Sequence, residues 1–343
     1  MEFSNLPHDI LLEVFKMCPQ SDRVKGRRLS KRLNQVLTSR GAPKLVADVF
    51  KVSAVEIEDR CVPIGRLNFH KSSKTRRIVS ISLKRHQRNE RVFEATPTTS
   101  NASKMPKIPE IVQQQLEQVK IGSALSFDGA AVHCNTQLLH SLLNNDLRSV
   151  SSLSFTMCHI EWTDAEFSQL VAHTSPVDLV FDFCHFHADF LTDKVFTQMP
   201  RLQSLSVQAR SWARFPALTD ETLQGWATNC PKSIRLSNQV ISGFTLEGIR
   251  QFVQNAPESN FELDLGLIVD TAAESLGKIL MIPKFSVTIS DEYLSRRVVL
   301  TKMANGSSLP NFVHNFSSGF QDRQKFAQKI SFSVYTPQIS SAQ

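Results

Sequence analysis

Histidine and cysteine side chains recur at two corresponding places in the chain, where together they could bind a transition metal. Cys158 is followed by His159, and Cys184 is followed by His185 and then, two positions later, by His187. Thiolate sulfur and imidazole nitrogen are the ligands that zinc prefers. However, the alternation of side chains along a strand does not by itself bring a complete tetrahedral set of ligands to one point. We therefore assign these residues to the core or to loops, and we expect no metal ligands.

Covalent catalysis is the other chemistry that such residues could perform. His133 directly precedes Cys134, but neighbouring residues rarely direct their side chains at each other, and no oxyanion-stabilising or glycine-rich element accompanies this pair. The phosphate-binding loop, the nucleophile elbow, the zinc-protease helix and the dinucleotide-binding turn are all missing from the sequence. We expect no catalytic residue, no cofactor and no enzymatic activity.

The composition is that of a globular protein that resides inside the cell. The chain has 343 residues, 41% of them hydrophobic, which is enough for a sizeable core. It has no apolar run long enough to span a membrane, and its first residues do not form a secretion signal. Its six cysteines show no CxxC spacing, which favours reduced thiols. We expect a cytoplasmic or nuclear location, or both, and no membrane partner.

The positive charge is concentrated in the first third of the chain. Residues 1–107 contain 22 Lys and Arg against 10 Asp and Glu, whereas residues 108–343 contain 17 against 22. Much of the excess lies in residues 71–91, so a scaffold that binds nucleic acid or an acidic partner through this segment is an alternative function. Few aromatic residues are interleaved there, which favours a solvated basic face and makes nucleic acid the less favoured partner.

The elements that position a functional surface begin at the N-terminus. Leu11, Val14 and Phe15 follow the spacing of an amphipathic helix, with Pro7 and Asp9 near its start. A second predicted helix has an apolar face made of Val24, Leu29, Leu33, Val36 and Leu37. Two short helices do not bury enough surface to be stable alone, so we expect a partner to cover them.

This N-terminal pattern resembles an F-box, in the Leu-Pro-x-Asp-Ile-Leu-x-x-Val-Phe core at 6–15 and the Ser-Lys-Arg-Leu-Asn at 30–34. The resemblance implies docking onto a Skp-type adaptor, and through it onto a cullin, in an SCF-type ubiquitin ligase. The residues that it implies for adaptor binding are Leu6, Pro7, Ile10, Leu11, Val14, Phe15, Leu29 and Leu33.

The second part of the chain repeats a unit of about 26 residues. Its mark is a triplet of apolar, any and apolar residues, with copies that start at Leu125, Leu153, Leu179, Leu205, Ile234, Leu263 and Val287. A threonine series recurs in step and predicts helix starts at Thr136, Thr163, Thr192, Thr219, Thr245 and Thr271. Prolines before the next strands predict helix ends at Pro176, Pro200, Pro231, Pro257 and Pro283. Such a period indicates a stack of strand and helix units.

The repeat is similar to degenerate leucine-rich repeats, since Val150, Leu153, Phe155, Cys158 and Ile160 fall on LxxLxLxxCxL. With the F-box, it resembles the substrate receptors of the expanded nematode-type F-box families, which implies that the repeats bind a target protein. Alternation along the strands predicts a mildly acidic exposed face, with substrate-binding residues Asp178, Asp182, Gln208, Arg235, Glu262 and Asp264.

The predicted fold is therefore α/β, with a helical F-box followed by a leucine-rich-repeat-like solenoid that has parallel strands on its concave face and helices outside. The expected parts are an F-box, a β-rich connector, a linker, the solenoid, and a C-terminal cap and tail, at residues 1–45, 46–95, 96–110, 111–290 and 291–343.

Overall fold

A computed structural model describes most of the chain, in two compact units. The described residues are 6–39, 42–58, 75–85, 88–95, 107–187, 189–269, 285–291, 295–303 and 326–335. The first unit comprises Met1–Val132 and Thr136–Val150, and the second comprises His133–Asn135 and Ser151–Gln343.

The first unit starts with three short helices, α1 (His8–Met17), α2 (Gln20–Leu29) and α3 (Lys31–Thr38). The sequence predicted one helix where α2 and α3 stand. The helix is interrupted at Ser30, which adopts an extended conformation and whose hydroxyl accepts a hydrogen bond from the Leu33 amide at 3.1 Å. A serine in this position begins a new helix because its hydroxyl satisfies an amide that has no partner within the helix.

A mixed sheet with two helices completes the first unit. Its strands lie in the order β4-β1-β2-β3, with β1 parallel to β4 and antiparallel to β2. The bounds are β1 (Leu45–Glu58), β2 (Thr75–Arg85), β3 (Arg88–Ala95), α4 (Ile108–Gln118), β4 (Val119–Asp128) and α5 (Thr136–Leu143). The expected β-rich connector thus shares a sheet with β4, which carries the first apolar triplet.

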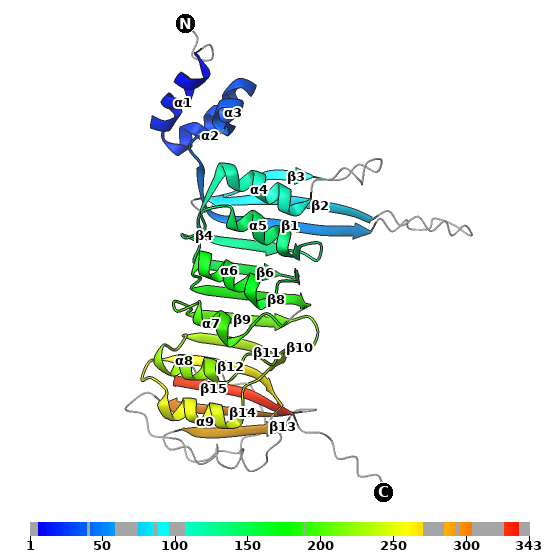
Figure 1. Cartoon of the computed structure of the whole chain (residues 1–343), viewed down its shortest axis with the longest axis vertical. Helices are drawn as coiled ribbons and strands as arrows, with labels where there is room; N and C mark the ends of the chain where they lie inside the picture. The colour runs from blue at the N-terminus through cyan, green and yellow to red at the C-terminus, as the bar shows by residue number, and fades with distance from the viewer. Residues whose placement is uncertain are drawn as a thin grey trace, which may run out of the picture. The chain divides into compact units, whose positions relative to one another are not determined.

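The second unit contains a larger mixed sheet with the strand order β6-β8-β9-β11-β12-β15-β14-β13. Helices α6 (Asp164–Thr174), α7 (Asp193–Thr197), α8 (Asp220–Thr228) and α9 (Leu246–Asn255) lie along one face of it (Figure 1). The strands are β5 (His133–Cys134), β6 (Ser152–Thr156), β7 (His159–Ile160), β8 (Asp178–Phe186), β9 (Ser204–Ala209), β10 (Ala213–Phe215), β11 (Ser233–Ser242), β12 (Phe261–Ile268), β13 (Ser286–Asp291), β14 (Ser295–Met303) and β15 (Phe326–Tyr335).

Five predicted triplets lie side by side in this sheet. Leu153 pairs with Leu179, which pairs with Leu205, and the series continues through Ile234 to Leu263 in parallel register. All five side chains are buried. The unit therefore has a continuous apolar core between the sheet and its helices.

The threonine series begins the helices, as the sequence predicted. Thr163, Thr192, Thr219 and Thr245 each precede a helix, and each hydroxyl accepts a hydrogen bond from an amide of the first turn. Thr136 is the first residue of α5, and Thr271 lies outside the described residues, as does Pro283.

The C-terminal strands differ from the prediction of parallel strands throughout. Val287-Thr288-Ile289 lies in β13, which pairs antiparallel with β14, and β14 pairs antiparallel with β15. The late strand β15 inserts between β12 and β14 and runs parallel to β12. The last triplet is thus separated from Leu263 by two strands, and its spacing of 24 residues does not reflect an equivalent position.

Among the described residues, no helix combines the length and apolar character needed to span a membrane.

Candidate functional site

The three N-terminal helices enclose a small apolar core of their own. Leu11, Phe15, Leu33, Val36 and Leu37 are buried against one another, and partly buried Leu6, Leu12 and Cys18 pack around them. Leu11, Phe15 and Cys18 recur at four- and three-residue intervals, so they form one stripe along α1. This stripe faces inward and joins α1 to α3.

A second apolar stripe on α1 remains exposed to solvent. Pro7, Ile10, Val14 and Met17 follow one another at intervals of three or four residues, one position beside the buried stripe. Ile10 is 50% exposed and Met17 is 82% exposed, whereas Val14 is partly buried. At the end of α2, Leu29 is 76% exposed. Large apolar side chains that gather on one face usually mark a contact surface.

Arginine side chains fix the geometry of these helices. Arg27 donates from Nη2 to the carbonyl oxygen of Leu37 at 2.9 Å, and Arg32 donates from Nη2 to that of Leu6 at 2.7 Å. Their guanidinium groups thus bind the chain just before α1 and the end of α3. Gly26 allows close approach, since a Cβ there would lie 3.2 Å from both Phe15 and Leu37.

Comparison with protein families assigns this part of the chain. Residues 3–42 match the F-box domain. An F-box implies a role in binding the Skp-type adaptor of SCF ubiquitin ligases. The sequence matches no curated protein.

The structure divides the predicted adaptor-binding residues of the F-box into two groups. Leu11, Phe15 and Leu33 lie in its core and hold the helices together, so they are not on the accessible surface. The exposed residues are Pro7, Ile10 and Leu29, with Leu6 and Val14 partly buried. The expectation of an uncovered helix pair therefore changes, because the third helix closes the core and only the second stripe stays uncovered. Sequence reasoning missed Met17, although its spacing from Ile10 and Val14 was visible.

A polar hollow in the second unit brings together four of the six predicted substrate-binding residues. Gln208, Arg235, Glu262 and Asp264 line a cavity of about 290 Å³, together with Arg297, Lys329 and Ser331. The other two, Asp178 and Asp182, lie on β8 and do not line it. Arg297 and Lys329 come from the late strands β14 and β15, and no sequence pattern indicated that they would lie in this hollow.

Ion pairs neutralise the acidic side chains of the hollow. Arg297 forms a salt bridge with Asp264 and also donates to the Ser331 hydroxyl at 3.0 Å. Lys329 donates to Glu262 at 2.9 Å, and this bond lowers the pKa of that carboxyl, with Arg235 contributing from 3.9 Å. The predicted mildly acidic face is therefore of mixed charge here.

Cysteines and histidines line up at the ends of β5, β7 and β8. Cys134, Cys158 and Cys184 are buried, and burial raises the pKa of the Cys184 thiol to about 12. Burial likewise raises the pKa of Cys134 well above its usual value. The three buried sulfurs are therefore core residues, which is one of the two roles, core or loop, that the sequence indicated.

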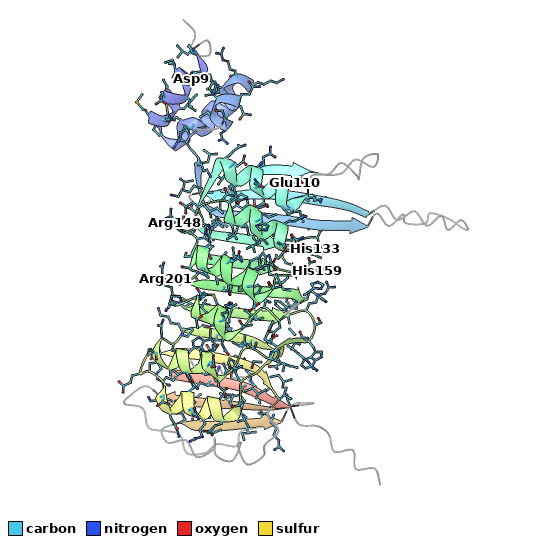
Figure 2. All side chains as sticks on the ribbon, viewed as in Figure 1. Asp9, Glu110, His133, Arg148, His159 and Arg201 are labelled. Atoms are coloured by element: carbon cyan, nitrogen blue, oxygen red, sulfur yellow. The ribbon has the colours of Figure 1, made fainter. Side chains whose placement is uncertain are left out.

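The histidines beside these cysteines stand on the outer side of the same strand ends. Figure 2 labels His133 and His159 next to each other, and their rings stack with centroids 4.8 Å apart. The ring of His159 also lies 5.4 Å from those of His185 and His187. Desolvation lowers the pKa of His159, and the neighbouring imidazoles lower it further. The structure thus brings together the histidines of the two predicted His/Cys segments.

Proposed function

We propose that this chain is the substrate-recognition subunit of an SCF-type ubiquitin ligase. The F-box binds a Skp-type adaptor and through it a cullin, while the second unit holds a target protein. The observation that carries this proposal is the exposed stripe of Pro7, Ile10, Val14 and Met17. Because the F-box core closes without it, the stripe is available to a partner.

Burial of this stripe supplies the driving force for adaptor binding. A Val, Leu, Ile or Met side chain that passes from water into a packed interface contributes about 1.5–3 kcal/mol. Met17 and Leu29 are largely exposed and can gain most of that amount, whereas half-exposed Ile10 can gain about half of it. A few residues of this kind commonly dominate an interface.

The second unit is proposed to be a leucine-rich-repeat-like solenoid of the kind found in nematode-type expanded F-box families. The in-register triplets and the recurring threonine caps support this interpretation. We place target binding on the strand face that carries the polar hollow, since its mixture of carboxylate, guanidinium and ammonium groups suits a protein segment of mixed charge.

The proposed role requires no catalysis by this chain. It brings a target close to the catalytic subunits of the ligase, and its place of action is the cytoplasm, the nucleus or both.

Co-expression with a Skp-type adaptor tests adaptor binding. The two proteins should elute together from a sizing column in equal amounts, and Ile10→Asp should weaken binding by about 30-fold or more, since it removes apolar burial and adds a charge that must be desolvated. Val55→Asp is the matched control, because Val55 is also 50% exposed but lies on β1. Leu11→Asp is unsuitable, since it would unfold the F-box core.

A second comparison tests the target surface. Arg235→Glu should reduce target ubiquitination while adaptor binding persists. Arg201→Glu serves as the control, since Arg201 is exposed in the same unit, lies away from the hollow and is labelled in Figure 2.

The alternative is a scaffold that binds nucleic acid or an acidic partner through residues 71–91. Residues 71–74 and 86–87 lie outside the described part of the chain, as do the side chains of the arginines in this segment. Salt-sensitive co-purification of nucleic acid, without an adaptor, would favour this function and contradict the receptor proposal.

A further inference from the structure

We propose that His159, His185 and His187 form a binding site for a divalent transition metal, with Zn²⁺ as the expected ion. Each residue offers one imidazole nitrogen, and the three nitrogens all lie within 4.8 Å of one another. Imidazole suits zinc, copper, iron and nickel, whereas calcium and magnesium require oxygen ligands. The site is independent of the proposed ligase function.

The spacing of the nitrogens is close to that of a coordination shell. His159 Nδ1 lies 3.1 Å from His187 Nε2. In a tetrahedral site with Zn–N bonds of about 2.0–2.1 Å, two ligand nitrogens stand roughly 3.3 Å apart. One pair therefore already has the separation that zinc needs. The nitrogen of the third imidazole, His185, lies within 4.8 Å of the other two, so its side chain must rotate toward them to complete the site, and water fills the fourth position.

One imidazole nitrogen of the cluster has no hydrogen-bond partner among the described residues. His185 Nδ1 is buried and has no hydrogen-bond partner among the residues that the structure describes. Buried polar atoms are nearly always paired, so a lone one calls for a bound water or ion. A metal ion at the centre of the three imidazoles would accept a lone pair from both His159 Nδ1 and His187 Nε2, which lie 3.1 Å apart.

The backbone holds the three histidines in place before any ion arrives. His159 pairs with His185 in the short parallel ladder between β7 and β8. The His185 amide donates to the Cys158 carbonyl at 2.9 Å, and the His187 amide donates to the Ile160 carbonyl at 3.0 Å. Sites whose backbone is held by paired strands are more precise in geometry than sites built on loops.

Two residues with positive φ bring the chain into this ladder. Met157 has φ 57° and Phe183 has φ 50°, each one residue before a buried cysteine of the series. Residues with bulky side chains seldom adopt this conformation, and it clusters at functional positions when the surrounding structure maintains it. In each case the next residue is a buried cysteine, Cys158 or Cys184, and the residue after it is a histidine of the proposed site, His159 or His185.

Neighbouring groups complete the surroundings of the site. His133 stacks on His159, and its Nδ1 lies 2.6 Å from Oε1 of Glu161. The stacked ring of His133 thus covers one face of the His159 ring. The cysteines do not belong to the ligand set, because the Cys184 sulfur donates into the core, to the Phe155 carbonyl at 3.2 Å.

Metal titration of the untagged full-length chain tests the site. After treatment with a chelator and dialysis, Zn²⁺ should bind at one ion per chain. His187→Ala should weaken this binding by more than the roughly 10- to 100-fold that outer-shell substitutions cost. His187 is exposed, so its removal should leave the circular dichroism unchanged. The matched control is His140→Ala, an exposed histidine of α5, which should bind zinc as the wild type does.

Cobalt substitution identifies the ligands. Co²⁺ at three imidazoles and a water should give visible absorption of a tetrahedral site without a thiolate-to-metal band. The proposal is overturned if no saturable binding occurs below about 1 mM, the lower limit of useful affinity, or if His187→Ala and His140→Ala bind zinc equally well. A strong thiolate band would also overturn it, because the cysteines would then be the ligands.

Discussion

Replacement of Asp193 by alanine should destabilise α8 strongly, although Asp193 itself lies in α7. Its carboxylate accepts hydrogen bonds from the Thr219 amide at 2.8 Å and the Thr219 hydroxyl at 2.6 Å. It also accepts from the Thr222 amide at 3.2 Å and the Thr222 hydroxyl at 2.5 Å. One side chain therefore joins the start of α7 to the first turn of α8.

The expected loss follows from these four contacts. Hydrogen bonds to a charged group contribute about 1.5–3 kcal/mol each, but bonds that share one carboxylate are not additive. After the substitution, the Thr222 amide still has the Thr219 carbonyl at 3.0 Å, whereas the Thr219 amide loses its carboxylate acceptor. We expect a loss of about 2–3 kcal/mol in the free energy of local opening of α8.

Asp164→Ala is the matched control for this substitution. Asp164 also directly follows the N-cap of its helix, but no described residue donates a hydrogen bond to its carboxylate. Its removal should cost only the interaction with the helix dipole, about 0.3–1 kcal/mol.

Native-state hydrogen exchange measures the difference. Amides of α8 should exchange about 30- to 150-fold faster in Asp193→Ala than in the wild type, since 1.4 kcal/mol corresponds to a factor of ten. Exchange of α8 should be unchanged in Asp164→Ala. If α8 also exchanges at the wild-type rate in Asp193→Ala, the reasoning is refuted, because the four contacts would then contribute nothing to α8.

Two further predictions concern the same unit. Gly248→Ala should destabilise α9 by about 2 kcal/mol in chemical denaturation, because the new Cβ would lie 2.0 Å from Cγ of Asp220. This loss is expected although alanine normally stabilises a helix by about 1 kcal/mol relative to glycine. A gain in stability would contradict the prediction, since it would show that the Asp220 carboxylate moves away freely. Burial raises the pKa of Cys184 and of Cys230 to about 12, so both thiols should resist alkylation by iodoacetamide at about pH 8 in the folded protein. Both should react faster as the pH rises, and both should react readily once the protein is unfolded. Rapid labelling of these cysteines in the folded chain, measured by mass spectrometry, would contradict this prediction.

Local chemistry explains why much of the second unit was predictable. A threonine hydroxyl that caps a helix, or a leucine triplet that alternates inward and outward, is determined by neighbours in sequence. Thr163, Thr219 and Leu179 therefore have the positions that their spacing indicated. The prolines between helix and strand belong to the same class of signal.

Pairings between distant segments were not predictable in the same way. Strand β15 lies between β12 and β14, and a sequence pattern does not specify which edge a late strand joins. Arg297 and Lys329 reach Asp264 and Glu262 only through this placement. The sequence therefore indicated acidic residues on the face but not the cations that neutralise them.

The F-box and the histidine site show the same limit. Periodicity identified α1 as amphipathic, but two adjacent apolar stripes satisfy the same period, and only packing against α3 distinguishes the buried Leu11 stripe from the exposed Ile10 stripe. Likewise, the sequence singled out His159, His185 and His187, but it did not reveal that their rings lie together, because that depends on the register between β7 and β8.

The central claim is that the exposed face of α1 is the docking surface for a Skp-type adaptor. Hydrogen exchange of the full chain with and without adaptor tests it most directly. We predict slower exchange in α1 and at the end of α2 when the adaptor is bound, with the strands of the second unit unchanged. Adaptor binding that leaves α1 unprotected and protects another part of the chain would contradict the claim.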